Sequence, residues 1–187
     1  MGKLIYQMQA SLDGYVEDRT GKFAWAAPDD EVHAHANREQ ARAGTDIYGR
    51  KMYEMMVYWE TADQQPETSP VAVEFAKIWQ TVDKIVVSRT LTEVWSARTR
   101  IVPSLGTDKM RKLKAEASKD IAVSGPTLAT QFLNAGLVDE ISVYIVPIVA
   151  GGGLPMFKDI SNLIRLERIE RIAFKSGFTF VRYAVRK

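Results

Sequence analysis

Residues 121–136 read Ile-Ala-Val-Ser-Gly-Pro-Thr-Leu-Ala-Thr-Gln-Phe-Leu-Asn-Ala-Gly. The first three residues form a short apolar, β-rich run. After Pro126 the apolar residues Leu128, Phe132 and Leu133 recur at helical spacing. The glycine and proline between the two patterns are typical of a tight turn that opens a helix. The stretch therefore predicts a strand followed at once by a helix, which ends at the last glycine.

Strand-like and helix-like segments alternate on the amino-terminal side of this unit. This alternation predicts an α/β fold with a mostly parallel central sheet and helices on both faces. Two strands around Ser176-Gly177, at 163–174 and 178–185, predict an antiparallel pair at the carboxyl-terminal end. The other expected strands are 4–9, 45–48, 84–88, 100–102 and 138–149. The other expected helices are 29–42, 71–79 and 107–118, and a further helix opens at 49–54. Gly44 is the expected C-cap of the helix at 29–42.

The composition limits the classes of protein to which the chain can belong. Its 187 residues, 46% of them apolar, predict a single domain over 1–187. Basic and acidic residues are mixed and the net charge is only +2, so no nucleic-acid partner is expected. The absence of cysteine excludes disulfides, thiolate zinc sites and cysteine nucleophiles. No apolar run fits a secretory signal or a membrane helix, so we expect a cytoplasmic protein without a membrane partner.

Several common catalytic motifs do not occur in the sequence. There is no Gly-x-x-x-x-Gly-Lys-Ser/Thr phosphate loop, no Gly-x-Gly-x-x-Gly after a strand and no Gly-x-Ser-x-Gly elbow. His33 and His35 are two positions apart on an expected helix, so their side chains point in different directions. We therefore expect no metal site and interpret both histidines as solvated surface residues.

Three strand ends carry residues that suit an anionic ligand: Ser124-Gly125-Pro126-Thr127, Gly49-Arg50-Lys51 and Ser88-Arg89-Thr90. Unpaired N–H groups at a helix N-terminus bind phosphate, and ligands of open α/β sheets collect at the carboxyl ends of the strands. Taken alone, the first turn is equally well an ordinary helix cap. No acidic residue ends these strands to bind a ribose hydroxyl, whereas the three cations suit a 2′-phosphate, which favours NADP over NAD.

The sequence resembles the dihydrofolate reductase-like superfamily, and within it the reductase domain of the bifunctional riboflavin-biosynthesis deaminase-reductase. The resemblance covers nearly the whole chain, without a deaminase half. Leu137-Val138-Asp139-Glu140 is its most specific part. The other segments that carry it are Tyr6–Gly14, Gly49–Glu54, Val87–Arg89, Val123–Leu128, Gly136, Pro147, Gly151–Gly153 and Phe157.

The resemblance implies a three-layer sandwich that binds NADPH and transfers a hydride to a small heterocycle, as in 5-amino-6-(5-phosphoribosylamino)uracil reductase. It also implies a homodimer. Pro126 departs from the family pattern, which has a second glycine there; proline removes one N–H donor from the turn. The implied cofactor-binding residues are Ser11 and Gly14 near the nicotinamide, Gly49, Arg50, Lys51, Met52, Ser124, Gly125, Pro126, Thr127 and Leu128 at the phosphates, and Ser88 and Arg89 near the adenosine.

Asp13 and Asp30 are the candidate catalytic acids. Asp13 is implied by the resemblance, close to the nicotinamide. Trp25 and Asp30 match the spacing in dihydrofolate reductase, where a Trp precedes a helix that carries the acid. An acid in an apolar pocket has a raised pKa and can pass a proton to a ring nitrogen, and Asp30 is the candidate for this role. The alternative is that Asp29 and Asp30 only cap the helix.

Trp25 and Tyr53 are the candidate substrate-binding residues. Tyr53, with Met56 and Trp59, can form the floor under a flat ring, although residues at this spacing more often belong to a core. Two other functions stay open at this point. One is a nucleotide-binding module without catalysis, and the other is a dihydrofolate reductase proper.

Overall fold

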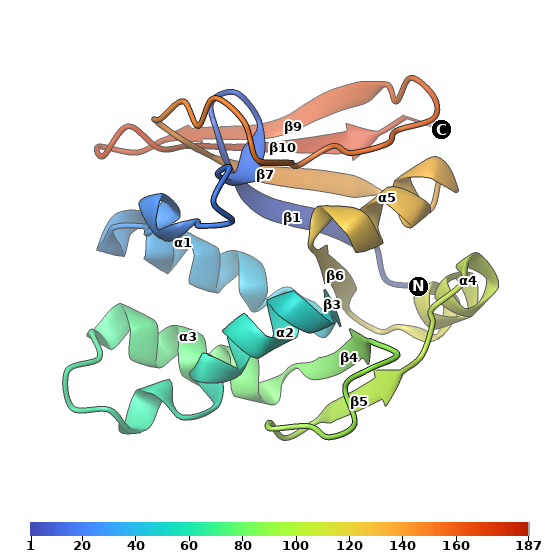
Figure 1. Ribbon diagram of the computed structural model, residues 1–187, viewed down its shortest axis with the longest axis horizontal. Helices are drawn as coiled ribbons and strands as arrows, with labels where there is room; N and C mark the ends of the chain where they lie inside the picture. Colours follow the sequence, from blue (N-terminus) through green and yellow to red (C-terminus); the bar gives the residue numbers. More distant parts are fainter. Residues whose placement is uncertain (187) are drawn as a thin grey trace.

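The computed structural model describes residues 1–186. Eight strands form one sheet in the order β5-β4-β3-β6-β1-β7-β10-β9, and β2 and β8 form a separate two-stranded sheet (Figure 1). The strands are β1 (Leu4–Ser11), β2 (Tyr15–Glu17), β3 (Ala43–Gly49), β4 (Asp83–Val87), β5 (Thr99–Val102), β6 (Asp120–Ser124), β7 (Glu140–Val146), β8 (Leu154–Pro155), β9 (Leu166–Ala173) and β10 (Thr179–Val185). The helices are α1 (Asp30–Gln40), α2 (Arg50–Met56), α3 (Pro70–Thr81), α4 (Thr107–Glu116) and α5 (Pro126–Asn134), with short 3-10 turns η1 (Ala24–Ala26), η2 (Val57–Glu60) and η3 (Ala62–Gln64).

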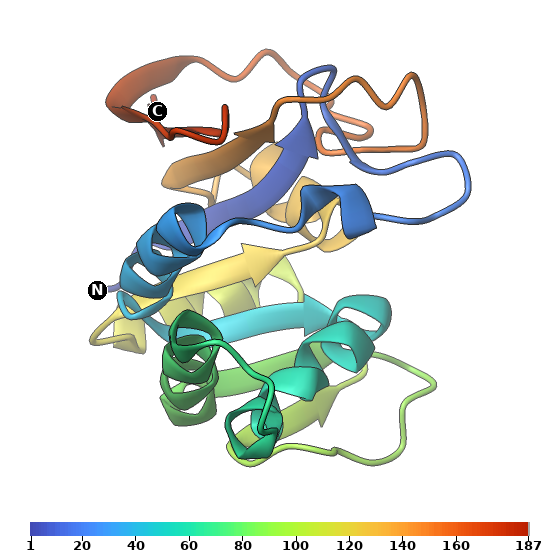
Figure 2. The same ribbon diagram turned by 90° about the vertical axis from the view of Figure 1, so that its left-hand side faces the viewer.

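The strands from β5 to β7 in the sheet order are parallel, whereas β10 is antiparallel to both β7 and β9. The predicted α/β fold and its antiparallel carboxyl-terminal pair are confirmed. Because the strands are parallel, the carboxyl ends of β1, β3, β4 and β6 lie at one edge (Figure 2). We call it the carboxyl edge.

Helices cover both faces of the sheet, as predicted. Successive strand residues point to opposite faces. Ile47 and Ile85 therefore pack in the same core cluster as Phe132 of α5, whereas the next residue of each strand faces Trp79 of α3. Val32 of α1 packs on the second face, against Tyr144 of β7. The result is a three-layer arrangement with α4 and α5 on one face and α1 and α3 on the other (Figures 1 and 2).

The expected role of Gly44 is wrong. Helix α1 ends at Gln40, and Gly44 lies inside β3. A Cβ atom at Gly44 would lie 2.9 Å from the Cβ of Lys119, so the glycine makes room for the segment that leads into β6. The short β2–β8 pair also had no expected counterpart in the sequence.

The expectation that both histidines are solvated is wrong for His35. It is 4% exposed; its Nδ1 lies 2.8 Å from the hydroxyl of Tyr144, and its ring packs on Phe180. His33 is half-buried and packs on Trp59 and Phe75. Burial lowers the pKa of both imidazoles. The two rings do point to different neighbours, as their spacing indicated.

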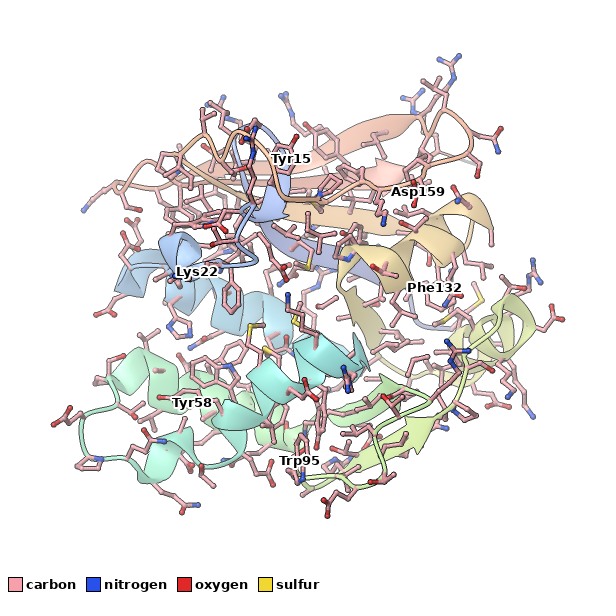
Figure 3. All side chains as sticks on the ribbon, in the orientation of Figure 1. Tyr15, Lys22, Tyr58, Trp95, Phe132 and Asp159 are labelled. Carbon is pink, nitrogen blue, oxygen red and sulfur yellow. The ribbon has the colours of Figure 1, made fainter. Side chains whose placement is uncertain are left out.

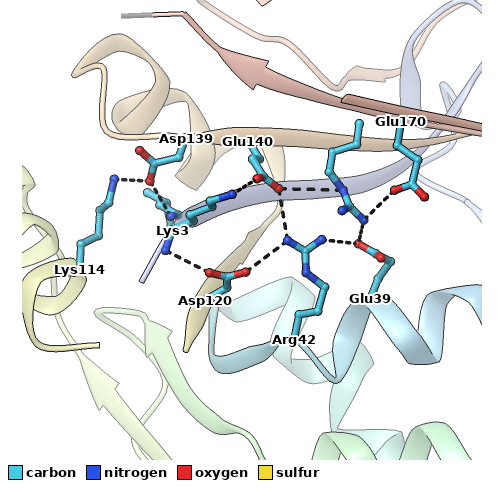
Figure 4. A network of polar contacts seen from close by, with 10 residues as sticks. Lys3, Glu39, Arg42, Lys114, Asp120, Asp139, Glu140 and Glu170 are labelled. Carbon is cyan, nitrogen blue, oxygen red and sulfur yellow. Dashed lines mark hydrogen bonds and ion pairs between the residues drawn. The ribbon is translucent and has the colours of Figure 1, made fainter. Parts of the chain in front are cut away.

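The opposite, amino edge of the sheet is held together by a charged network (Figure 4). The carboxylate of Glu140, 3% exposed, accepts from Lys3 Nζ at 2.6 Å and lies 3.5 Å from the guanidinium of Arg42. Arg182 of β10 adds a third cation at 3.9 Å from Glu140 and also pairs with Glu39 of α1. This network joins α1, β7 and β10 with the segments that lead into β1 and β3, at the edge away from the candidate site. Among residues 1–186, no helix is long and apolar enough to cross a bilayer.

Candidate active site

Four segments that follow parallel strands meet at the carboxyl edge. In the sheet, β4, β3, β6 and β1 are consecutive neighbours, so the turns after them lie in a row. Figure 2 shows these strands ending on the same side of the molecule. The predicted cofactor residues, which are spread over more than a hundred positions in the sequence, are therefore brought to one edge.

The turn between β6 and α5 is open to a ligand. Gly125 has φ +98°, and no atom lies within 4 Å of the position of a Cβ there. Its N–H points to Met8 Sδ at 3.2 Å, and Pro126, the first residue of α5, has no N–H. No side chain caps this helix. Because the first N–H groups of a helix have no partner within it, Thr127 and Leu128 supply the donors that remain for an anion.

The turn between β3 and α2 supplies cations. Gly49 is the N-cap of α2. Arg50 is mostly exposed and lies 3.7 Å from Glu54. Lys51, also exposed, makes an ion pair of 2.7 Å with Glu17. The side chain of Met52 is partly buried and packs against the core cluster that contains Trp79 of α3.

The segment after β4 is not a strand-to-helix junction, contrary to the expectation. Ser88 Oγ accepts hydrogen bonds from the N–H groups of Thr90 at 3.2 Å and Leu91 at 3.0 Å. These bonds close a turn that continues into an irregular loop. The segment therefore offers no helix N-terminus. Arg89 stays exposed at this position, and no ion pair of its own is found in residues 1–186.

Asp13 anchors the loop that follows β1. Its carboxylate accepts from Ser11 Oγ at 2.6 Å and from the N–H groups of Ala150 at 2.9 Å and Gly151 at 2.8 Å. The hydrogen bond from Ser11, followed by those from the backbone, lowers the pKa of Asp13 to about 2. This acid is therefore ionised at neutral pH. The structure shows Asp13 fixing the loop, and its expected catalytic role stays a prediction. Ser11 is buried, and Gly14 has φ +86° in the same turn.

Gly151–Gly153 pack against the loop that follows β1. A Cβ at Gly153 would lie 2.0 Å from the carbonyl oxygen of Glu17, and one at Gly152 would lie 2.5 Å from Arg19 Nε. Arg19 also donates to the carbonyl oxygen of Gly151 at 2.6 Å. Close packing on β2 and the residues after it explains Gly152 and Gly153, whereas Gly151 has open space and a φ of +70°.

The residues expected on the substrate side, Trp25, Asp30 and Tyr53, do not form a common pocket. Asp29 caps α1 by accepting from Val32 N–H at 2.9 Å, which confirms the capping interpretation for that residue. Asp30 is exposed in the first turn, so the expected apolar pocket around it is wrong. Trp25 is half-buried and donates from Nε1 to the carbonyl oxygen of Lys22 at 3.1 Å.

Tyr53 is fully buried, so the structure does not present it to a substrate. Its hydroxyl accepts from Trp95 N–H at 2.8 Å, and the ring of Trp95 stacks on it with 5.9 Å between the ring centroids. Trp95 lies in the loop before β5 (Figure 3). The core interpretation of Tyr53, Met56 and Trp59 is the one that holds. Sequence reasoning missed that the ring of His33 packs on Trp59. His33 follows Asp30 by about one helical turn, and this spacing was the signal in the sequence that could have shown that the two residues share a face of α1.

Comparison with known proteins adds to this geometry. The model of the RibD C-terminal domain matches residues 2–180. The chain belongs to that family. It is 30% identical over 182 residues, 97% of this chain and 94% of the relative, to a Bacillus subtilis protein known as uncharacterized protein YyaP. The resemblance deduced from the sequence is confirmed.

Two solved structures share the fold of this RibD-type domain. One is a putative riboflavin biosynthesis protein from Shewanella sp. PV-4, with a TM-score of 0.76, 22% identity and 99% of both chains covered. The other is a diaminohydroxyphosphoribosylaminopyrimidine deaminase/5-amino-6-(5-phosphoribosylamino)uracil reductase from Thermotoga maritima. Its TM-score is 0.69 at 14% identity, with 99% of this chain and 57% of that chain covered. Identities this low show the fold alone.

Proposed function

We propose that this protein is an NADPH-dependent reductase that transfers a hydride to a small heterocycle of the ribosylaminopyrimidine type. One observation carries the proposal. The β6–α5 turn, with a glycine at φ +98° and no atom within 4 Å of its Cβ position, stands at the carboxyl edge beside the exposed cations Arg50 and Lys51. Open α/β sheets bind dinucleotides at such an edge.

The residues at the carboxyl edge fit a dinucleotide that carries phosphates. The N–H groups of Thr127 and Leu128, two and three residues after Gly125, suit the diphosphate, because Pro126 has no N–H and the N–H of Gly125 contacts Met8. Arg50 and Arg89 suit the 2′-phosphate, because both guanidinium groups are exposed. NADPH, when bound, supplies the hydride. The protein holds its phosphates, and the loop fixed by Asp13 lies beside the end of β1.

The substrate class rests on the relatives. The family and the activity named for the Thermotoga protein support a ribosylaminopyrimidine, and with it a place in riboflavin biosynthesis. We further propose that the protein works in the cytoplasm and forms a homodimer. The exposed apolar residues Leu163, Leu166 and Ile169, before and within β9, support the dimer.

A second candidate is a nucleotide-binding module without catalysis. It is favoured by a specific observation: Asp30 is exposed and Tyr53 is buried, so the two groups expected on the substrate side do not form a pocket. Binding of NADPH is common to both candidates, whereas its oxidation belongs to the reductase alone.

The test begins with NADPH binding. Energy transfer from the four tryptophans to the nicotinamide and a rise in melting temperature both report the bound cofactor. If neither signal appears with up to about 0.5 mM NADPH, both candidates are contradicted. Binding, followed by substrate-dependent loss of NADPH absorbance with a ribosylaminopyrimidine, supports the reductase. Binding without oxidation, across ribosylaminopyrimidines, pteridines and dihydrofolate, supports the module.

A further inference from the structure

An ion pair spans the carboxyl end of β6. Lys51 belongs to α2, which follows β3, and Glu17 belongs to β2, which follows β1. In the sheet, β6 lies between β3 and β1. The contact of 2.7 Å between Lys51 Nζ and Glu17 Oε2 therefore joins the two sides of the β6–α5 turn. The cation stands next to the turn that we propose for the phosphates, and its partner is a carboxylate.

The two partners differ in mobility. Glu17 is held by pairing of β2 with β8 and by the close packing of Gly153 on its carbonyl oxygen, and its side chain is 18% exposed. The side chain of Lys51 is 70% exposed and ends a flexible stem. Lysine is a point charge with rotatable donors, so it can change partners without a change in the backbone. Glu17, in contrast, cannot leave without moving the loop.

We propose that Glu17 lowers the affinity of the carboxyl edge for its phosphate-bearing ligand by occupying Lys51, and that a bound phosphate takes Lys51 over. This inference rests on the proposed function. A phosphate is a strong acceptor for an ammonium group, so it competes with the carboxylate. The carboxylate also repels the ligand's charge. When Lys51 leaves Glu17 for the phosphate, the ion pair that ties residues 12–22 to α2 is broken. Cofactor binding is thereby coupled to release of this loop from α2.

The first measurement is the dissociation constant for NADPH in Glu17→Gln. We expect it to fall by about threefold, the scale of one exposed ion pair, with a smaller fall when Lys51→Gln is already present. Glu67→Gln, an exposed acid in the loop before α3, makes the same change in net charge and should leave the constant unchanged. An equal or weaker affinity in Glu17→Gln would show that Glu17 does not lower the affinity of the site, and the inference would be wrong.

The second measurement needs no cofactor. Arg19 and Lys22 are exposed trypsin sites in the loop that the ion pair ties to α2. Both Glu17→Gln and Lys51→Gln should be cut faster there than the wild type, whereas Glu67→Gln should be cut at the wild-type rate. Unchanged cutting contradicts the inference even where NADPH binds. A wild type that does not bind NADPH contradicts the proposed function, and the rate of cutting then still decides whether the ion pair holds the loop.

Discussion

Asp46 makes the stability of the fold depend on pH in a direction that can be calculated. It is 1% exposed in the centre of β3, where its Oδ2 accepts from the hydroxyl of Tyr48 at 2.7 Å and from Gln40 Nε2 at 2.8 Å. Burial raises the pKa of Asp46 to about 6, against the hydrogen bonds and the charge of Lys84, which lower it. The carboxyl group of the folded protein thus holds its proton more tightly than that of the unfolded chain.

The sign and size follow from linkage. Because the pKa of Asp46 is higher in the folded state, its contribution to stability is full below about pH 4 and is lost as the pH rises through about 6. A rise from 3.8 to about 6, at about 1.4 kcal/mol for each tenfold change in proton affinity, amounts to about 3 kcal/mol. Asp46→Asn does not titrate, and its amide group can stand where the protonated oxygen stands.

The assay is urea unfolding of both proteins at pH 4, 5, 6 and 7. We expect similar stability at pH 4 and a growing advantage of Asp46→Asn at higher pH, up to about 3 kcal/mol. Effects of other titrating groups, such as His35, are common to both proteins and cancel in the difference. Asp108→Asn, at a side chain that is 95% exposed, should show no such trend. A constant difference between wild type and Asp46→Asn across this range would refute the reasoning.

Three further predictions concern the loop, the cofactor and the buried histidine. Gly153→Ala should destabilise the fold by more than about 2 kcal/mol, because its Cβ would meet the carbonyl oxygen of Glu17 at 2.0 Å. Gly49→Ala, at a position with φ −76° and free space, should lower the free energy of unfolding by less than about 1 kcal/mol. Thermal melts of both variants measure the two effects. Arg50→Ala should weaken NADPH binding much more than NADH binding in a fluorescence titration; equal losses contradict contact with the 2′-phosphate. Burial lowers the pKa of His35, so its contribution is present above about pH 6.5 and is lost as the pH falls. Melting temperatures of His35→Gln should therefore fall less than those of the wild type between pH 7.5 and pH 5, and parallel curves would exclude this role.

The order of strands and helices was predictable because each element carries its own signal. Alternating segments, the glycine and proline before α5, and the apolar run of β4 are local features. They predict a mostly parallel sheet without knowledge of any distant contact. The position of Gly125 at a turn with positive φ follows in the same way, since the residue type itself permits that conformation.

The side chains of the site were less predictable because their partners are distant in the sequence. His35 lies beside Tyr144, 109 positions away, and Asp13 binds the N–H of Gly151, 138 positions away. A histidine or aspartate in a local pattern does not reveal such a partner. The same limit applies to Tyr53, whose environment is completed by the loop at Trp95.

The carboxyl edge therefore contains two kinds of polar residue that a sequence alone does not separate. Ser11 donates a hydrogen bond to Asp13, and Asp13 accepts another from the N–H of Gly151, so these side chains stabilise the fold. Among residues 1–186, the exposed cations Arg50 and Lys51 form ion pairs only with Glu54 and Glu17, and ion pairs of exposed cations contribute little stability. A phosphate can displace such a partner at small cost, whereas it cannot displace Asp13 without opening the loop. Affinity for the ligand is therefore expected to depend on Arg50, Lys51 and the carboxylates beside them, and the integrity of the edge on Asp13.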